Sequence, residues 1–586
     1  METTHLTNDK LQGIRRRSFL KLAGAGAMGT FMLDTISSRF VLASVLPQSS
    51  LLSKFTEQLP IPSIIDARGG GSFNLPMAPG MHTFHSVLPA TPTWGYAGAA
   101  YLGPTFQTMR GVPINVTATN LLGTHPLASV IDTSLNGALE LDKTNPRVSV
   151  HLHGGNTEPG SDGHPEATFT VGANRSYHYH NDQEATTLWY HDHAMGITRL
   201  NVYAGLAGFY LLRDQYDTGE TDGPIGLPTV PYEIPLVIQD KMFNWDGALA
   251  YPLGEFGSIW APEFFGDVAT VNGKVWPNLN VDRGLYRFRI LNGSNARVYS
   301  LRLSGGQMMF QIGAEGGLLN APVVLNQLII APGERADVLI DFSGLTAGTK
   351  IVLKNVAPVP FPNGPRAERR GGLPIKDIMQ FTVGTATGFG GAIPTLLRSR
   401  QISPLPAPAK VRNLTLVEIA DPETDAPLMA LVNNLPYDTD QIESPLVDTV
   451  EQWNIINTTG DTHPIHLHLV QFQLLGRQKF DVDSFMEANY PELPDPEGAG
   501  FGPWPAPSAD AFTRGGMKGP DPNEMGWKDT VRANPGEITR IRVPFGGGAA
   551  TGLPFAQSFT GDYVFHCHIL EHEDNEMMLP YRVVSS

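Results

Sequence analysis

From about residue 60 onward, the chain is a series of short segments in which apolar and polar residues alternate. Clusters of Gly, Pro, Asn and Asp separate these segments and favour turns. An alternation with a period of two predicts strands that are buried on one face. The pattern therefore predicts an all-β protein.

Some of the predicted strands share a weak internal repeat. Three alternating strands end on or near an asparagine: INVTATNLL (114–122), LYRFRILNGSN (285–295) and VEQWNIINTTG (450–460), with Asn120, Asn292 and Asn457. In a second pattern, a Pro-Gly-Glu turn leads into an alternating strand at 331–342 and again at 534–545. The repeats predict three related β-sandwich domains, at 55–215, 230–385 and 405–584.

Composition agrees with this division and narrows the class of protein. With 586 residues the chain is too long for one core, and its 62 glycines and 48 prolines suit a turn-rich β protein. A net charge of −16 argues against a nucleic acid or an anionic membrane as partner. The single cysteine excludes an internal disulfide.

The N-terminal residues, 1–43, read as a signal peptide. RRRSFLK (15–21) precedes a short apolar run that is too short to span a membrane, and no other segment is long and apolar enough. The RRSFLK core resembles the twin-arginine signal, with Arg16 and Arg17 as the pair. It predicts that the twin-arginine machinery exports the folded protein to the periplasm or the exterior, without stable membrane insertion.

The stretch FHCHILEHEDNEMM (565–578) contains the only cysteine, Cys567. His572 follows it after five residues and Met577 after ten, with Met578 as the competing register. With a second imidazole from elsewhere, these residues give a His₂Cys site with an axial methionine, which suits an electron-transfer copper.

The same stretch places a second set of ligands beside the first. The residues before Ile569 read as a strand, so Cys567 should face one side of the sheet, and His566 and His568 the other. A metal bound through Cys567 would then lie a few bonds from metals that the two histidines hold.

Ten of the 17 histidines lie in four clusters: HLHGG (151–155), WYHDHAMG (189–196), HPIHLH (463–468) and HCHILEH (566–572). On a strand, residues i and i+2 project to one face, so each His-X-His pair can reach neighbouring metals. VYSLRL (298–303) takes the position of HPIHLH in the second repeat and has no histidine. We therefore expect metal chemistry between the first and third domains, with the second as a spacer. YHYH (177–180) lacks the apolar setting and is expected to be structural or exposed.

In their order and spacing, the four clusters resemble those of the multicopper oxidases. The resemblance covers essentially the whole mature chain and is closest to bacterial spore-coat-type laccases, with bilirubin oxidase nearby. Further stretches resemble that subgroup: SDGHPEA (161–167), HAMGITRLNVYAGLAGFYLL (193–212), HPIHLHLVQFQLLGR (463–477) and GWKDT (526–530).

The resemblance implies three cupredoxin-like, Greek-key domains and four copper ions. The type 1 copper would take His463, Cys567, His572 and an axial Met577. The type 2 copper of a trinuclear cluster would take His151 and His466. The type 3 pair would take His153, His191, His193, His468, His566 and His568.

Two acids are expected to deliver protons to the trinuclear cluster, or to hold its ligand imidazoles. They are Glu573, next to a ligand, and Asp162, 11 residues after another. Asp192 is expected to be structural, whereas Glu571 and Asp574 are expected to be surface charges.

The resemblance implies a monomeric laccase-like enzyme that oxidises phenols, aromatic amines or bilirubin-like compounds one electron at a time and reduces O₂ to water. The Pro/Gly-rich insert 481–526 has only three methionines, too few for a copper-gathering surface, which favours small organic reductants. It is expected to form either a lid beside the type 1 site or a surface loop.

Other functions remain open at this point. An oxidase of cuprous or manganese ions would use the same copper sites, and a copper-free structural relative would have lost ligands that this chain keeps. A copper nitrite reductase normally lacks the full set of four clusters. A zinc hydrolase gives no reason for a cysteine flanked by two histidines.

Overall fold

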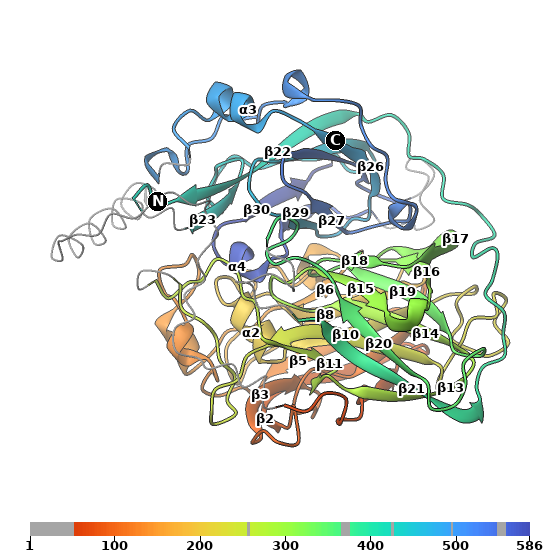
Figure 1. Cartoon of the computed structure of the whole chain (residues 1–586). Helices are drawn as coiled ribbons and strands as arrows, with labels where there is room; N and C mark the ends of the chain where they lie inside the picture. Colours follow the sequence, from red (N-terminus) through yellow and green to blue (C-terminus); the bar gives the residue numbers. More distant parts are fainter. Residues whose placement is uncertain are drawn as a thin grey trace, which may run out of the picture. The chain divides into compact units, whose positions relative to one another are not determined.

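The computed structural model describes residues 52–254, 258–364, 375–423, 427–493, 496–547 and 558–585. These residues form β-sheets joined by loops and a few short helices, which confirms the all-β prediction (Figure 1). The predicted signal peptide, 1–43, lies outside the described residues. Among the helices that are described, none has both the length and the apolar character to cross a bilayer.

The first third of the chain forms two sheets that face each other. One has the strand order β1 (Ile64–Asp66), β4 (Thr105–Met109), β9 (Ala207–Arg213), β8 (Thr186–Asp192) and β6 (Val150–His153). The other has the order β3 (Thr91–Tyr96), β2 (Gly71–His82), β5 (Ile114–Asn120) and β7 (Asn174–Tyr179). Apolar side chains from both sheets, including Trp94, Val116 and Tyr210, pack in a common core.

The middle third repeats this plan with more strands. One sheet runs β12 (Lys274–Val275), β11 (Val268–Val271), β10 (Glu233–Lys241), β14 (Leu285–Asn292), β19 (Arg335–Asp341), β16 (Met309–Ala314) and β17 (Gly317–Leu325). The other runs β13 (Asn278–Arg283), β21 (Asp377–Thr387), β20 (Lys350–Asn355), β15 (Tyr299–Leu303) and β18 (Leu328–Ile330). Their core continues into the first third through Trp189 and Tyr203.

The last third is again a pair of sheets. One runs β23 (Pro427–Val432), β22 (Lys410–Ala420), β24 (Val450–Asn457), β28 (Glu537–Pro544) and β26 (Gln473–Lys479). The other runs β27 (Thr530–Ala533), β25 (His463–Leu467), β29 (Gly561–Cys567) and β30 (Met578–Val583). Cys567 is buried in the core between them with Trp453 and Phe565.

The internal repeat is visible in the strand pairing. Strands β5, β14 and β24 each have one parallel and one antiparallel neighbour. Each ends on a buried asparagine whose Nδ2 donates to two backbone carbonyls and whose Oδ1 accepts the N–H two residues on. The three turns, at Asn120, Asn292 and Asn457, therefore share the same hydrogen-bonding pattern.

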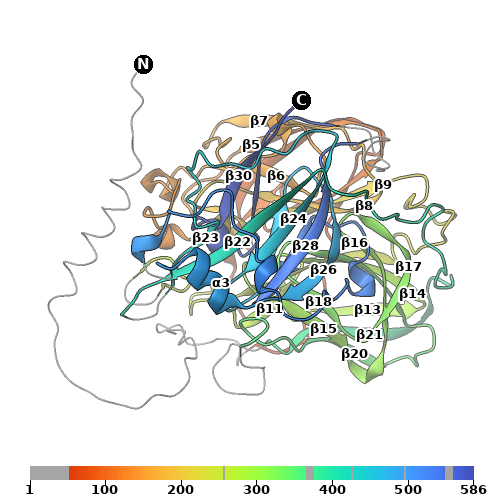
Figure 2. The ribbon, with the colours of Figure 1, turned by 90° about the horizontal axis from the view of Figure 1, so that it is seen from above.

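The insert 481–526 packs on the third domain. Helix α3 (Val482–Asn489) starts at Asp481, whose side chain caps Ser484 N–H. Helix α3 lies beside β22 and β23 (Figure 2). Apolar residues of the insert pack against Val417 and Ile419 of β22 and Leu431 of β23. The core that contains Cys567 draws on other residues of these two strands, Leu414, Leu416, Ala430 and Val432. The insert therefore covers the sheet face that points away from the cysteine.

Candidate metal centre

Strand register brings histidines together in the first and third domains. β6 and β8 are antiparallel neighbours, with His151 opposite His191. β25 and β29 are also antiparallel, with His466 opposite His566. Because side chains alternate along a strand, the histidine two residues further on in β6 shares the face of the first. His193 follows the end of β8.

Eight buried histidines from these two domains converge on one place: His151, His153, His191, His193, His466, His468, His566 and His568. The Nε2 atoms of His193 and His468 each lie 3.2 Å from Nε2 of His566. The rings of His153 and His466 stack with their centroids 3.6 Å apart. Side chains from distant parts of the sequence therefore line a single site.

The ring nitrogens of this site fit metal ions. Six of the imidazoles have a buried nitrogen with no hydrogen-bond partner among the described residues: Nε2 of His151, His191 and His466, Nδ1 of His153 and His193, and both nitrogens of His568. Burial lowers the pKa of all six, so they are neutral and keep a lone pair. An unpaired buried polar group costs about 1–3 kcal/mol, which a bound cation would offset.

A second, smaller site lies on the other side of β29. Nδ1 of His463 is 3.5 Å from Sγ of Cys567 and 3.2 Å from Nδ1 of His572. Sγ and Nδ1 of His572 are 3.8 Å apart, and all three groups are buried. Burial raises the pKa of the Cys567 thiol, so a bound cation is needed to favour the thiolate. One thiolate and two imidazoles at these distances suit a trigonal copper site.

The two methionines after Cys567 lie in different surroundings. Met577 packs in the apolar cluster that contains Cys567 and Ile465, and its carbonyl accepts the Cys567 N–H at 2.9 Å. Met578 packs with Met195 and Val564 instead. This placement favours Met577 as the thioether beside the thiol.

Polar groups surround the outer edge of this smaller site. Nε2 of His463 lies 2.7 Å from Oγ1 of Thr459, 3.5 Å from Oε1 of Glu418 and 3.6 Å from Oδ1 of Asp461. Glu263, from the second domain, shares a hydrogen bond with Asp461. Three carboxyl groups therefore gather at one histidine of the site.

Both predicted acids contact histidines of the larger site. Oδ2 of Asp162 is 2.7 Å from Nδ1 of His468, and burial raises the pKa of Asp162 to about 8. The carboxyl oxygens of Glu573 lie 3.3 Å from Nδ1 of His193 and 3.0 Å from Nδ1 of His566. Each acid thus contacts its histidines at the ring nitrogen that points away from the centre of the larger site.

The expectation that Glu571 and Asp574 are surface charges is wrong, since both are buried. Oε1 of Glu571 accepts from the Asn295 amide at 2.8 Å and from the Tyr251 hydroxyl. Asp574 accepts two backbone N–H groups of helix α2 (Thr198–Ala204) and the Arg199 guanidinium, all at 3.0–3.1 Å. These partners lie in the first and second domains, so the sequence around α4 (Leu570–Glu573) could not reveal them.

Two groups were expected to be structural and not metal ligands, Asp192 and the histidines of YHYH. Asp192 is buried and accepts from the backbone N–H groups of Ser149 and Ala194 and from the Asn201 amide. His178 lies on β7, in the sheet that does not contain β6 and β8, and bonds to Asn115. One group was missed: Asp529, in GWKDT, lies beside two histidines of the larger site.

Comparisons with known proteins agree with this geometry. Three family models described as "Multicopper oxidase" match residues 140–217, 260–350 and 407–586. A laccase of Bacillus subtilis is 36% identical, with 90% of this chain and 98% of the relative covered. A laccase of Bacillus stratosphericus is 38% identical, with 91% and 99% covered.

Among solved structures, the McoA multicopper oxidase of Aquifex aeolicus superposes with a TM-score of 0.68 at 27% identity, covering 91% of this chain and all of that one. The neighbours of the fold are thus multicopper oxidases built of cupredoxin-like domains, as expected from the histidine clusters. Sequence identity over nearly the full length of the relatives and the paired metal sites lead to one conclusion. The chain belongs to the multicopper oxidase family.

Proposed function

We propose that this copper-dependent oxidoreductase is laccase-like and takes single electrons from phenols, aromatic amines or bilirubin-like compounds at one site, to reduce O₂ to water at another. The observation that most directly supports this proposal is the position of Cys567 between His566 and His568. Its sulfur faces the smaller site, while the two imidazoles face the larger one. The chain itself therefore links an electron-collecting site to an O₂-reducing site.

Four copper ions would occupy these sites and supply the one-electron redox chemistry and the reduction of O₂. His463, Cys567, His572 and Met577 would hold type 1, and His151 and His466 would hold type 2. The type 3 pair would take His153, His191, His193, His468, His566 and His568. The smaller site contains the thiol, and the larger one is lined by imidazoles, which supports this division.

The two acids would serve the larger site. Reduction of O₂ to water consumes four protons for every four electrons, and the surrounding imidazoles would be occupied in binding metal ions. Glu573 contacts His193 of the first domain and His566 of the third. Asp162 contacts His468. We assign proton delivery to both, along with the fixing of ring orientation.

The place and state of the enzyme are part of the proposal. The RRSFLK segment at 16–21 supports export by the twin-arginine machinery to the periplasm or beyond, since that route carries proteins folded around their cofactors. A monomer is proposed, because both sites are completed within one chain. The domain limits 55–215, 230–385 and 405–584 are kept, since each range holds one pair of facing sheets, apart from the last two residues of β21.

A second candidate substrate is a metal ion, such as cuprous or manganese ion. The observation that favours it is the group of three carboxyls, Glu263, Glu418 and Asp461, at the outer edge of the smaller site. Carboxylate oxygens bind hard cations, which favours manganese ion over the soft cuprous ion, and His463 would offer a short route for the electron. Asp461→Asn would then lower kcat/KM for the metal ion and leave the oxidation of a phenol unchanged.

The test of the main proposal is copper stoichiometry on the purified chain, combined with a panel of reductants and an oxygen electrode. We expect about four coppers per chain, a blue colour that bleaches with a phenol and returns in air, and no release of peroxide. Two or fewer coppers in a fully loaded sample would refute the site assignment.

A further inference from the structure

Asp529 joins two histidines of the larger site that come from different domains. Its Oδ1 lies 3.1 Å from Nε2 of His153, and its carbonyl oxygen lies 2.9 Å from Nδ1 of His466. Nδ1 of His153 and Nε2 of His466 are left without a partner among the described residues. One residue therefore selects which nitrogen of each ring faces the metal site, Nδ1 in one ring and Nε2 in the other.

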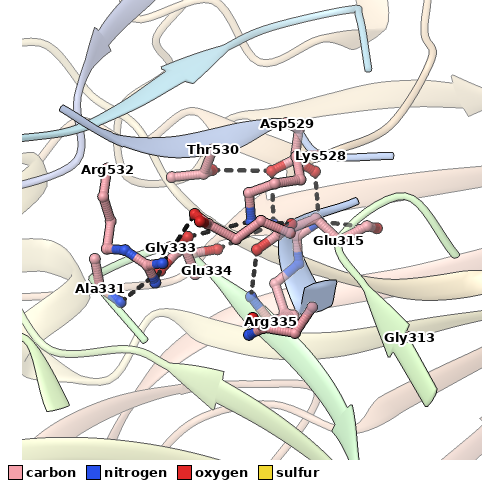
Figure 3. Close-up of polar contacts among 12 residues, drawn as sticks. Gly313, Glu315, Ala331, Gly333, Glu334, Arg335, Lys528, Asp529, Thr530 and Arg532 are labelled. Carbon is pink, nitrogen blue, oxygen red and sulfur yellow. Dashed lines mark hydrogen bonds and ion pairs between the residues drawn. The ribbon is translucent and has the colours of Figure 1, made fainter. Parts of the chain in front are cut away.

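Asp529 is better suited to hold ligands than to be one. Its carboxylate is already engaged by Arg335, whose Nη1 donates to Oδ1 at 2.8 Å and whose Nη2 donates to Oδ2 at 2.5 Å (Figure 3). The Thr530 hydroxyl donates to Oδ1 as well, at 2.9 Å. A two-pronged guanidinium fixes the plane of a carboxylate and occupies both of its oxygens.

Arg335 belongs to the second domain, at the start of β19. Its Nε donates to the carbonyl of Thr187 on β8 at 2.9 Å, and the same strand carries His191 in the first domain. With Asp529 of the third domain, this one side chain therefore touches all three domains. It is buried, and so is its partner.

Two glycines leave room for this pair. A Cβ on Gly154, in HLHGG, would lie 2.4 Å from Oδ2 of Asp529 and 2.6 Å from Nη2 of Arg335, and its φ is +83°. A Cβ on Gly333, in the Pro-Gly-Glu turn before β19, would lie 2.7 Å from the His568 ring. The turn of the second domain is thus packed directly against His568 of the third.

Neighbouring ion pairs hold the same junction. Lys528 binds Glu315 and Glu334 at 2.7 and 3.2 Å, and Arg532 binds Glu334 at 2.9 Å (Figure 3). These pairs join β27 and the residues before it to the second domain on both sides of Asp529. Each charge is buried and paired, so the loss of one partner would leave the other uncompensated.

We propose that Arg335 and Asp529 are positioning residues through which the second domain sets the orientation of His153 and His466, and so the affinity and geometry of the type 2 copper and its type 3 neighbour. The inference rests on the proposed function and adds a role for the domain that was expected to be a spacer.

The test compares Arg335→Met, Arg335→Lys and Asp529→Asn with the wild-type holoenzyme. Arg297→Met is the matched control, because Arg297 forms a buried pair with Asp240 in the second domain, at 2.8 Å. The measurements are type 1 absorbance per chain, the type 2 EPR spectrum, and copper retained against a graded chelator. Circular dichroism checks the fold.

We expect Arg335→Met and Asp529→Asn to keep the blue absorbance but to lose copper from the larger site at about 10–100-fold lower chelator, with altered type 2 hyperfine splitting. Arg335→Lys, which keeps the charge without the two-pronged contact, should fall between them and the wild type. The control should show the wild-type spectrum and retention.

Wild-type EPR and retention in the folded variants would overturn the inference while the proposed function stood. A wild-type chain that binds no copper would overturn both. If Arg335→Met does not fold, Asp529→Asn, which conserves volume, decides: an unchanged type 2 spectrum refutes the role and a changed one supports it.

Discussion

Glu573→Gln tests how protons reach the O₂-reducing site. The substitution conserves shape and leaves the ring contacts of His193 and His566, at 3.3 and 3.0 Å, available to an amide. It removes only the group that can take up and release a proton. Positioned proton transfer contributes typically about 10²–10⁴-fold, so we expect kcat for O₂ consumption to fall by about 100-fold or more.

The assay separates proton transfer from a purely structural role. Type 1 absorbance and its bleaching by a phenol should be unchanged, whereas reoxidation by O₂ should be slow and show a larger solvent deuterium effect. Glu571→Gln is the matched control, since Glu571 is buried on the same short helix and contacts Tyr251 and Asn295 instead of histidines. Wild-type reoxidation in Glu573→Gln, or an equal loss in Glu571→Gln, would refute the reasoning.

Two further predictions concern the smaller site and acid stability. Met577→Leu should raise the redox potential of the type 1 copper and keep the blue colour, whereas Met578→Leu should change neither. Redox titration measures this potential. A shift in Met578→Leu alone would make Met578, and not Met577, the axial ligand. Buried guanidinium groups of Arg213 and Arg289 outweigh desolvation and lower the pKa of Glu233 to about 2. Because the folded pKa is below the unfolded one, Glu233 stabilises the folded state above pH ~4.5, and this stabilisation is lost as pH falls towards 2. Glu233→Gln should therefore flatten the acid limb of the denaturation curve, and an unaltered limb would contradict this.

Local sequence patterns predicted the strands and the opposite orientation of Cys567 and its flanking histidines because this geometry is local, whereas the ligand set of each copper came from the resemblance to the multicopper oxidases. Alternation along β29 alone places Cys567 on one face and its flanking histidines on the other. The asparagine repeat marks strands that the structure shows with equivalent neighbours, β5, β14 and β24. Spacing within one strand is enough for inferences of this kind.

What the sequence could not predict depends on contacts between domains. Glu571 and Asp574 resemble surface charges until the side chains that bury them are known. Asp529 lies in a recognised stretch, yet its role depends on Arg335, nearly two hundred positions earlier. No strand periodicity encodes such a pairing, since it arises only when separate domains dock.

The histidines of the larger site come from the first and last domains of the chain, and the entire second domain lies between His193 and His463. A metal bound there would link the first and third domains and so close a very long loop of the chain. This link between the domains cannot form until the C-terminal strands have been synthesised and folded. Loaded protein should therefore resist proteolysis as one unit, whereas chains truncated before β25, which lack every third-domain ligand, should not bind the metal cluster at this site, whatever the stability of their remaining domains.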